Sequence, residues 1–157
     1  MGRLVGKPME LDDLDRRIIQ ILYEDGRATY AEIGRKLKVS ENTIRFRVER
    51  LMKSGVIRRV AALVDPRAVG LNNSAAVMLR IDPQHLESAL KTLADMRDVY
   101  NIYQLSGDYD AIAVIMCRDL QHLQKLVTDI KKIDGVADVN TLITLRVVKA
   151  ELRYSLQ

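Results

Sequence analysis

The sequence has few of the residues that disulfide-rich, metal-binding or membrane-spanning proteins need. It contains one cysteine, Cys117, which excludes an internal disulfide and a cysteine-based zinc cluster. No apolar run approaches the roughly 18 residues of a transmembrane helix. The first residues form a stretch that is too short and too polar for a secretory signal. We therefore expect a cytoplasmic protein without membrane association.

The usual signatures of catalysis and cofactor binding are missing as well. The sequence has no nucleophile elbow, no glycine-rich loop to cradle a phosphate and no paired-histidine metal motif. His85 and His122 are its two histidines. We therefore predict no catalytic residues, no metal and no cofactor, and we expect a binding protein.

The positive charge is concentrated in one segment. The chain carries a net +4, but residues 27–59 have ten basic and three acidic side chains, a net +7. Residues 9–26 have two basic and six acidic side chains, and residues 66–157 have eleven of each. A basic segment can be a solvated surface or a polyanion-binding surface, so the local structure has to decide between these interpretations.

The first part of the chain predicts three short helices. Apolar residues recur at helical spacing from Leu11 to Leu22, with Asp12 and Asp15 where a helix start favours carboxylates. A second helix opens at the capping box Thr29-Tyr30-Ala31-Glu32. Ile33 and Leu37 form the inner face of that helix.

A tight turn leads into an arginine-rich third helix. Ser40 can cap this helix. Its inner face consists of three apolar residues at i, i+4 and i+7, which are Ile44, Val48 and Leu51. Gly34 lies where the two helices are expected to cross. Lys38 occupies the turn, where many such motifs have glycine. Either Lys38 adopts a left-handed backbone, which costs about 1 kcal/mol relative to glycine, or the turn is looser. The arrangement predicts a helix-turn-helix domain over residues 10–59, after a tail over residues 1–9.

The outward face of the third helix supplies candidate DNA contacts. In a helix-turn-helix, the start of the second helix of the motif reaches base edges in the major groove. Asparagine pairs with adenine, arginine with guanine, and threonine or an aromatic ring contacts the thymine methyl. We predict base contacts by Asn42, Thr43, Arg45 and Phe46, and we also count Ser40 among the DNA-binding residues. We predict phosphate contacts, which position the protein without reading sequence, by Arg47, Arg50, Arg58 and Arg59.

A linker strand and hinge are predicted over residues 60–71. The extended run over residues 58–64 is broken at Asp65-Pro66, because proline lacks an N–H and restricts the residue before it. A loop that contains glycine and asparagine follows. We therefore place the domain boundary in this segment.

Residues 72–157 contain an internal repeat at an offset of 37 residues. Asp82-Pro83-Gln84-His85-Leu86 matches Asp119-Leu120-Gln121-His122-Leu123 at four of five positions. Each copy predicts strand, helix, strand, with Asp82 and Asp119 as helix caps; the expected ranges are 75–81, 83–96 and 99–105, then 111–117, 120–133 and 136–148. Two such units predict an α+β fold, a ferredoxin-like βαββαβ domain with helices on one face of an antiparallel sheet.

The other face of that sheet has no helix to cover it. Strand residues such as Val77, Leu79, Ile112, Val114 and Ile115 supply apolar side chains to both faces. An uncovered apolar face indicates a partner, most simply a second copy of the chain. We therefore predict a homodimer through this domain.

A polar turn joins the two halves of the predicted sheet. Gly107, Asp108, Tyr109 and Asp110 follow one another, and both glycine and aspartate are turn residues. The turn is explained by geometry alone or by a small-molecule site. Free backbone N–H groups can hold a carboxylate and an aspartate can hold an amino group, a pairing that suits an amino acid.

The chain resembles the Lrp/AsnC family of leucine-responsive, feast/famine regulators from Leu11 to about Lys149. The resemblance is carried by residues 11–19, by the helix-turn-helix with Gly55-Val56-Ile57, by Gly107–Asp110, and by Gly135-Val136 with Thr141. It implies a DNA-binding transcription regulator whose C-terminal domain dimerises, assembles into octamers or related rings and binds an amino acid. By this resemblance Gly107, Asp108, Tyr109, Asp110 and Thr141 form the effector site. Val139 stands where family members often have a second threonine.

Two other interpretations stay open. Sirohaem decarboxylases resemble the same two-domain architecture, and an enzyme of that kind would draw on His85 and His122. An architectural protein would bind DNA broadly and ignore small molecules. Equal affinity for random and upstream DNA would favour the architectural protein, and turnover of a sirohaem-type substrate would favour the enzyme.

Overall fold

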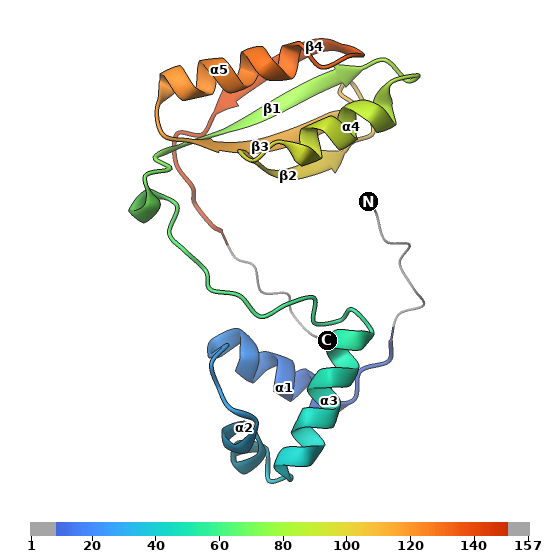
Figure 1. Ribbon diagram of the computed structural model, residues 1–157, viewed down its shortest axis with the longest axis vertical. Coiled ribbons are helices and arrows are strands. Elements are labelled where there is room, and N and C mark those ends of the chain that lie inside the picture. The colour runs from blue at the N-terminus through green and yellow to red at the C-terminus, as the bar shows by residue number, and fades with distance from the viewer. Residues whose placement is uncertain (1–8, 151–157) are drawn as a thin grey trace. The chain divides into compact units, whose positions relative to one another are not determined.

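The computed structural model describes residues 9–150, which fold as two compact units (Figure 1). The division falls between Leu63 and Val64. This position lies inside the predicted boundary segment of residues 60–71. No helix within residues 9–150 is long and apolar enough to cross a membrane.

The N-terminal unit consists of three helices that begin where the sequence predicts. They are α1 (Asp13–Glu24), α2 (Tyr30–Leu37) and α3 (Glu41–Lys53). Asp12 and Asp15 form a capping box at α1, and Thr29 and Glu32 form one at α2. The Ser40 hydroxyl accepts the Thr43 N–H at 3.1 Å and caps α3. These caps fix the starts of the helices because they satisfy otherwise free backbone donors.

The three helices share one apolar core. Each helix presents a stripe of residues at helical spacing to the others, and the buried members are Ile18, Ile21, Ile33, Leu37, Ile44 and Val48. Leu51 is also fully buried. The predicted inner face of α3 is therefore confirmed.

The turn between α2 and α3 is tight at two positions. Lys38 adopts a left-handed backbone, with φ 59° and ψ 42°, so the looser turn does not occur. A Cβ atom on Gly34 would lie 2.8 Å from the Val39 carbonyl oxygen. The absence of a side chain at Gly34 therefore allows the helix to approach the turn.

The linker does not contain the predicted strand. Residues 58–64 have no regular secondary structure, and a short 3₁₀ helix, η1, covers Arg67–Val69. Val60, Leu63 and Val64 are exposed. An extended segment becomes a strand when a neighbouring strand satisfies its backbone groups, and this segment has no such neighbour within residues 9–150.

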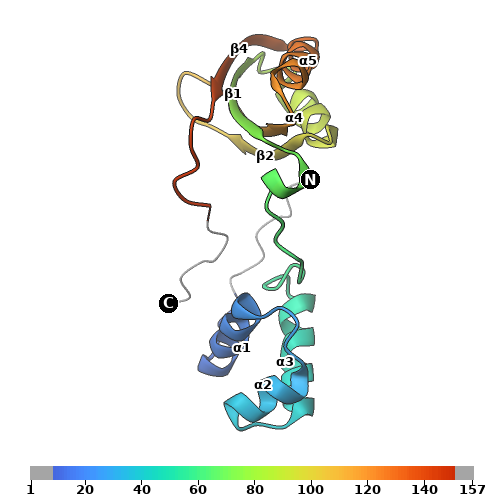
Figure 2. The same ribbon diagram turned by 90° about the vertical axis from the view of Figure 1, so that its left-hand side faces the viewer.

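The C-terminal unit is a four-stranded antiparallel sheet with two helices on one face (Figure 2). Its elements are β1 (Asn73–Ile81), α4 (Leu86–Asp95), β2 (Val99–Gln104), β3 (Ala111–Cys117), α5 (Leu120–Lys131) and β4 (Val136–Ile143). The strand order is β2-β3-β1-β4, with β1 paired to both β3 and β4. The predicted ferredoxin-like α+β fold is confirmed.

The two helices of the repeat start differently. Asp119 caps α5 as predicted, because its Oδ1 accepts the His122 N–H at 2.7 Å. The prediction that Asp82 caps a helix starting at Pro83 was wrong. Asp82 instead closes a turn by accepting the Gln84 N–H at 2.8 Å, and α4 begins at Leu86.

Strand β4 is shorter than predicted and ends at Ile143 rather than Val148. Ile143 pairs with Ala75, and only Ser74 and Asn73 of β1 lie beyond that pair, so residues 146–148 have no strand opposite them. The Thr144 N–H donates to the Ser74 carbonyl at 2.9 Å, just past the end of β4. A strand cannot continue where its ladder has no partner.

The sheet has one covered and one uncovered face. On β1 and β3 the covered face is fully buried, with residues such as Val77, Leu79, Ala113 and Ile115 packed against the helices. The alternate residues of these strands, Met78, Ile112 and Val114, are half-buried, and Leu142 on β4 is exposed. We call these four residues the open sheet face.

Candidate DNA interface and effector site

The outward side of α3 carries the predicted base-reading residues. Asn42, Arg45 and Phe46 are exposed and Thr43 is half-buried. Phe46, the sole phenylalanine of the chain, is 64 % exposed. An aromatic ring that is exposed to this extent is a candidate for contact with a partner.

Two of these side chains are held in place by neighbours. The Ser40 and Thr43 hydroxyls lie 2.8 Å apart at the start of α3. Arg45 donates to Glu41 Oε1 at 2.9 Å, and its guanidinium lies 5.3 Å from the centre of the Tyr30 ring. Arg45 is therefore oriented by α2 and by its own helix before any partner binds.

Arg47 and Arg50 have partners that the sequence reasoning did not find. Arg47 donates to Asp12 Oδ2 and, at 3.2 Å, to Asp15 Oδ1, while Arg50 donates to Asp15 Oδ2. We call Asp12, Asp15, Arg47 and Arg50 the α1–α3 charge cluster. The spacing of three residues on both helices could have suggested it, because residues three apart share a helix face.

The charge cluster changes the titration of two of its members. Arg47 holds the pKa of the Asp12 carboxyl below its ordinary value, chiefly through the hydrogen bond between them, helped by the Asp15 backbone N–H. Asp12, followed by Asp15, holds the pKa of Arg47 above its ordinary value. Asp12 and Arg47 therefore stabilise each other's charged form.

Arg58 and Arg59 lie beyond α3 in the segment without regular structure. Both side chains are exposed, and neither has a side-chain hydrogen bond or ion pair within residues 9–150. They belong to the same unit as the three helices. Their charges are free to meet a polyanion.

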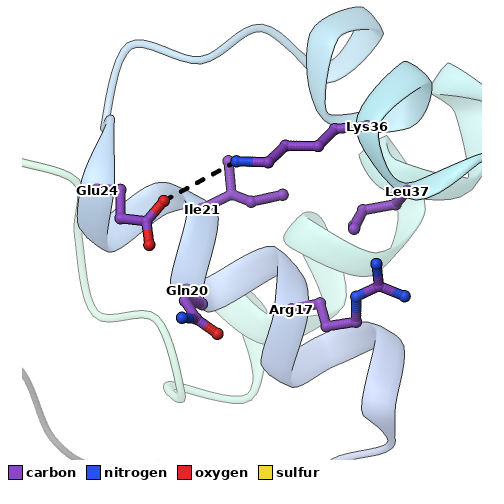
Figure 3. Close-up of a pocket in the computed structure, with 6 residues that line it drawn as sticks. All are labelled: Arg17, Gln20, Ile21, Glu24, Lys36 and Leu37. Carbon is purple, nitrogen blue, oxygen red and sulfur yellow. Dashed lines mark ion pairs between the residues drawn. The ribbon is translucent and has the colours of Figure 1, made fainter.

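A surface depression lies between α1 and α2 (Figure 3). It is lined by Arg17, Gln20, Ile21, Glu24, Lys36 and Leu37. Lys36 and Glu24 face each other across it, 3.9 Å apart and more than half exposed. It contains none of the predicted DNA-contact residues, so we assign it no role in DNA binding.

The predicted effector turn is held against β1 by its own aspartate. Asp110 Oδ2 accepts the Ile81 N–H at 2.7 Å, and the Asp110 N–H donates to the Leu79 carbonyl at 2.9 Å. Gly107 has a φ of 123°, which side chains rarely allow. Asp110 therefore has a structural task here, with its second carboxylate oxygen left for another partner.

Tyr109 joins the turn to two other strands, whereas Asp108 is exposed. The Arg80 guanidinium lies 5.3 Å from the centre of the Tyr109 ring, and the Asn140 amide donates to the Tyr109 hydroxyl at 3.3 Å. The sequence reasoning missed Arg80 and Asn140, because their approach depends on the register of β1 and β4.

Thr141 lies on the other side of the sheet from Asn140. It stands opposite Val77, a residue of the covered face, and lines an open depression along α5 with Thr128, Gln124 and Lys131. Within one chain, therefore, the structure does not bring Thr141 together with the turn of residues 107–110.

The two histidines lie beside different carboxylates of the C-terminal unit. His85 Nε2 is 3.4 Å from Asp134 Oδ2, and His122 Nε2 is 3.6 Å from Asp98 Oδ2. Within residues 9–150 no group of three histidine, cysteine or acidic side chains is placed to hold a metal ion.

Burial raises the pKa of the Cys117 thiol, which packs as a small core residue.

The fold defines a class: a helix-turn-helix unit joined to an α+β unit with a four-stranded antiparallel sheet. The AsnC-type helix-turn-helix domain matches residues 11–52, and the Lrp/AsnC ligand binding domain matches residues 74–154. The chain belongs to the Lrp/AsnC family of transcriptional regulators.

Relatives and solved structures agree with this assignment. An uncharacterized HTH-type transcriptional regulator of Pyrococcus horikoshii is 36 % identical over 144 residues, which cover 91 % of both chains. The HTH-type transcriptional regulator FL11 of Pyrococcus furiosus is 32 % identical over 139 residues, 88 % of this chain and 92 % of that protein. The structure of Escherichia coli AsnC superposes with a TM-score of 0.85 at 30 % identity, over 91 % of this chain and 97 % of that one.

A further structure shares the fold at lower identity. A transcriptional regulator from Neisseria meningitidis, solved as a complex with L-Met, has a TM-score of 0.85 at 24 % identity. The match covers 93 % of this chain and 97 % of that one.

Proposed function

We propose that this protein is a sequence-specific regulator that reads operator DNA with α3 and responds to an amino acid bound at the turn of residues 107–110. Two copies joined through the open sheet face present two helix-turn-helix units to two half-sites, and such dimers assemble into an octamer or a related ring. The family supports regulation of transcription, and the fold of the Neisseria L-Met complex supports an amino acid as the ligand.

The observation that carries the DNA-reading part is the exposed face of α3. Asn42, Arg45 and Phe46 are exposed on a helix whose start is capped and whose inner side is buried. The side chains that can read bases therefore project from a rigid support. Asparagine and arginine supply hydrogen bonds to base edges, and Phe46 supplies an apolar contact to a thymine methyl.

The DNA-reading part is tested with the variant Asn42→Ala/Phe46→Ala. A bidentate base contact is worth about 1–3 kcal/mol, so the affinity of the variant for the chain's own upstream DNA should fall by at least about fivefold. Fluorescence anisotropy on labelled duplexes measures the affinity. Lys125→Ala, a change at an exposed residue of α5, is the matched control and should bind like the unchanged protein.

Two results would contradict that proposal. If Asn42→Ala/Phe46→Ala bound the upstream duplex as tightly as Lys125→Ala, α3 would not be the reading helix. If the unchanged protein bound upstream and scrambled duplexes equally well, the architectural interpretation would replace it.

The observation that carries the effector part is the built geometry of the turn. Asp110 keeps one carboxylate oxygen on the Ile81 N–H and has a second oxygen available for an amino group. Gly107 has a positive φ, and both Gly107 and Asp108 are exposed to solvent. Thr141 belongs to the same site only if a second copy of the chain brings it there.

The effector part is tested with a thermal-shift screen of the twenty amino acids at millimolar concentration. A ligand at about 100 times its Kd stabilises the folded state by roughly 2.7 kcal/mol. We expect one selective hit that Asp110→Asn abolishes, because asparagine keeps the acceptor for Ile81 but lacks the charge. Asp95→Asn, at an exposed residue of α4, should keep the shift. A hit that survives Asp110→Asn would place the site elsewhere.

A further inference from the structure

Asp15 is the sole fully buried charged residue among the described ones, so its charge has to be balanced inside the protein. Asp15 Oδ1 accepts from Arg47, and Asp15 Oδ2 accepts from Arg50. Asp15 Oδ2 also accepts the Asp12 backbone N–H at 3.3 Å. A buried carboxylate that loses its cations is strongly destabilising. A DNA phosphate that drew Arg47 and Arg50 away from Asp15 would therefore leave a buried carboxylate unpaired.

The charge cluster contributes no net charge to the DNA-binding surface. Its two carboxylates balance its two guanidinium groups, and the Arg47 side chain is only 23 % exposed. Binding to DNA gains affinity when positive groups replace the counterions of phosphates. Two arginines that are already neutralised by Asp12 and Asp15 have little to add to that exchange.

The cluster also ties α3 to the start of α1 at two positions on each helix. Arg47 and Arg50 lie three residues apart on α3, and Asp12 and Asp15 lie three residues apart at the start of α1. Two anchor points on each helix resist both sliding and rotation of one helix against the other. Asn42 and Phe46 are on the same helix, so the rotation of α3 decides where they point.

We propose that Arg47 and Arg50 are positioning residues: with Asp12 and Asp15 they hold α3 in its DNA-reading orientation and do not contact phosphates. This inference rests on the proposed function, since it assigns tasks within the same DNA-binding surface. It replaces the sequence-based interpretation of these two arginines as phosphate contacts. The phosphate contacts fall to exposed basic side chains such as Lys53, Arg58 and Arg59.

The test is the salt dependence of DNA affinity in the full-length protein. The variant Arg47→Gln/Arg50→Gln is compared with Arg58→Gln/Arg59→Gln on upstream and scrambled duplexes between 50 and 300 mM salt. Each lost phosphate contact reduces the slope of log K against log salt by about 0.9, so two lost contacts reduce it by about 1.8. A second cluster variant adds Asp12→Asn/Asp15→Asn, which removes the unpaired carboxylates and protects the fold.

The cluster variants should keep the slope of the unchanged protein but lose preference for upstream over scrambled DNA by about tenfold, the equivalent of one base contact. Arg58→Gln/Arg59→Gln should show the reverse: a slope lower by about 1.8 and an unchanged preference. A lower slope in both cluster variants would overturn the proposal, because it would place these arginines on phosphates.

A purely structural role is also distinguishable. If the folded cluster variants kept both the slope and the preference, the cluster would stabilise the unit without orienting α3, and the proposal would fail. Failure of the proposed function itself gives a separate result, since the unchanged protein would then show no preference between the duplexes.

Discussion

Asp12 serves two helices at once. Its Oδ1 accepts the Asp15 N–H at 2.9 Å and caps α1, while its Oδ2 accepts from Arg47 on α3. Both hydrogen bonds need the ionised carboxylate to reach full strength. The pKa of Asp12 is accordingly lowered, first by Arg47 and then by the backbone of Asp15.

This lowered pKa predicts an acid-sensitive contribution to stability. A carboxyl group whose pKa is lower in the folded state stabilises the fold above its unfolded value near 4, and this stabilisation disappears as the pH falls through the folded value. The change Asp12→Asn should therefore lower the free energy of unfolding at pH 7, and the difference from the unchanged protein should shrink below about pH 4. Urea unfolding at several pH values measures it.

The control for this prediction is Asp13→Asn, at an exposed neighbour in the same first turn of α1. Asp13 has no ion pair within residues 9–150, so its replacement should cost less at pH 7. If the difference in the free energy of unfolding between Asp12→Asn and the unchanged protein did not depend on pH, the charge of Asp12 would not stabilise the contact between α1 and α3.

Caps were predictable at the residue scale and ion pairs were not. The capping roles of Asp12, Thr29 and Ser40 follow from local spacing, because a cap acts on the backbone two or three residues away. The pairing of Asp15 with Arg50 joins residues 35 apart in the chain. It depends on how α1 and α3 pack, which no local pattern specifies.

The turn between α2 and α3 shows how one unsuitable residue is tolerated within an element. Lys38 adopts the left-handed conformation that costs about 1 kcal/mol relative to glycine, and the packing of α2 on α3 compensates. Replacing Lys38 by glycine should therefore raise the free energy of unfolding by about 1 kcal/mol. Chemical denaturation of the purified variant tests this.

Lys36→Gly is the matched control, because Lys36 lies inside α2 with helical neighbours on both sides. Glycine at that position should lower stability by about 1 kcal/mol. If Lys38→Gly were also destabilising, the left-handed turn would not be the strained feature that the backbone angle indicates.

The ends of elements in the C-terminal unit were less predictable than the elements themselves. The continuous apolar runs of β1 and β3 predict strands, but they do not predict which alternate residues the helices bury. The late start of α4 comes from the Asp82-Pro83 turn, although the equivalent Asp119-Leu120 opens a helix directly. The predicted extension of β4 to Val148 is wrong because β1, its neighbour in the sheet, has only two residues beyond the Ala75–Ile143 pair.

At the scale of the whole molecule, the open sheet face predicts self-association. Met78, Ile112 and Val114 form an apolar patch on the side without helices, and Leu142 on β4 extends it. Val114→Lys should produce monomers, because a charge in the centre of an apolar interface is left without a partner. Sedimentation velocity, with circular dichroism to confirm the fold, measures the outcome.

Ala94→Lys is the control for self-association, since Ala94 is exposed on α4 on the other side of the sheet. It should leave the oligomer unchanged. An oligomer that survives Val114→Lys would move the interface away from this face. The effector site depends on the same question, because Thr141 and the turn of residues 107–110 are not brought together within one chain.

Hydroxyl-radical footprinting of the chain's own upstream DNA is the most direct test of sequence-specific reading by α3. Two linked copies should protect two short stretches separated by about 10 base pairs, or a multiple of that spacing. Asn42→Ala/Phe46→Ala should lose this pattern at the same protein concentration, whereas Lys125→Ala should keep it. Uniform protection that ignores sequence, or a footprint that is identical in the Asn42→Ala/Phe46→Ala variant, would contradict a regulator that reads DNA through α3.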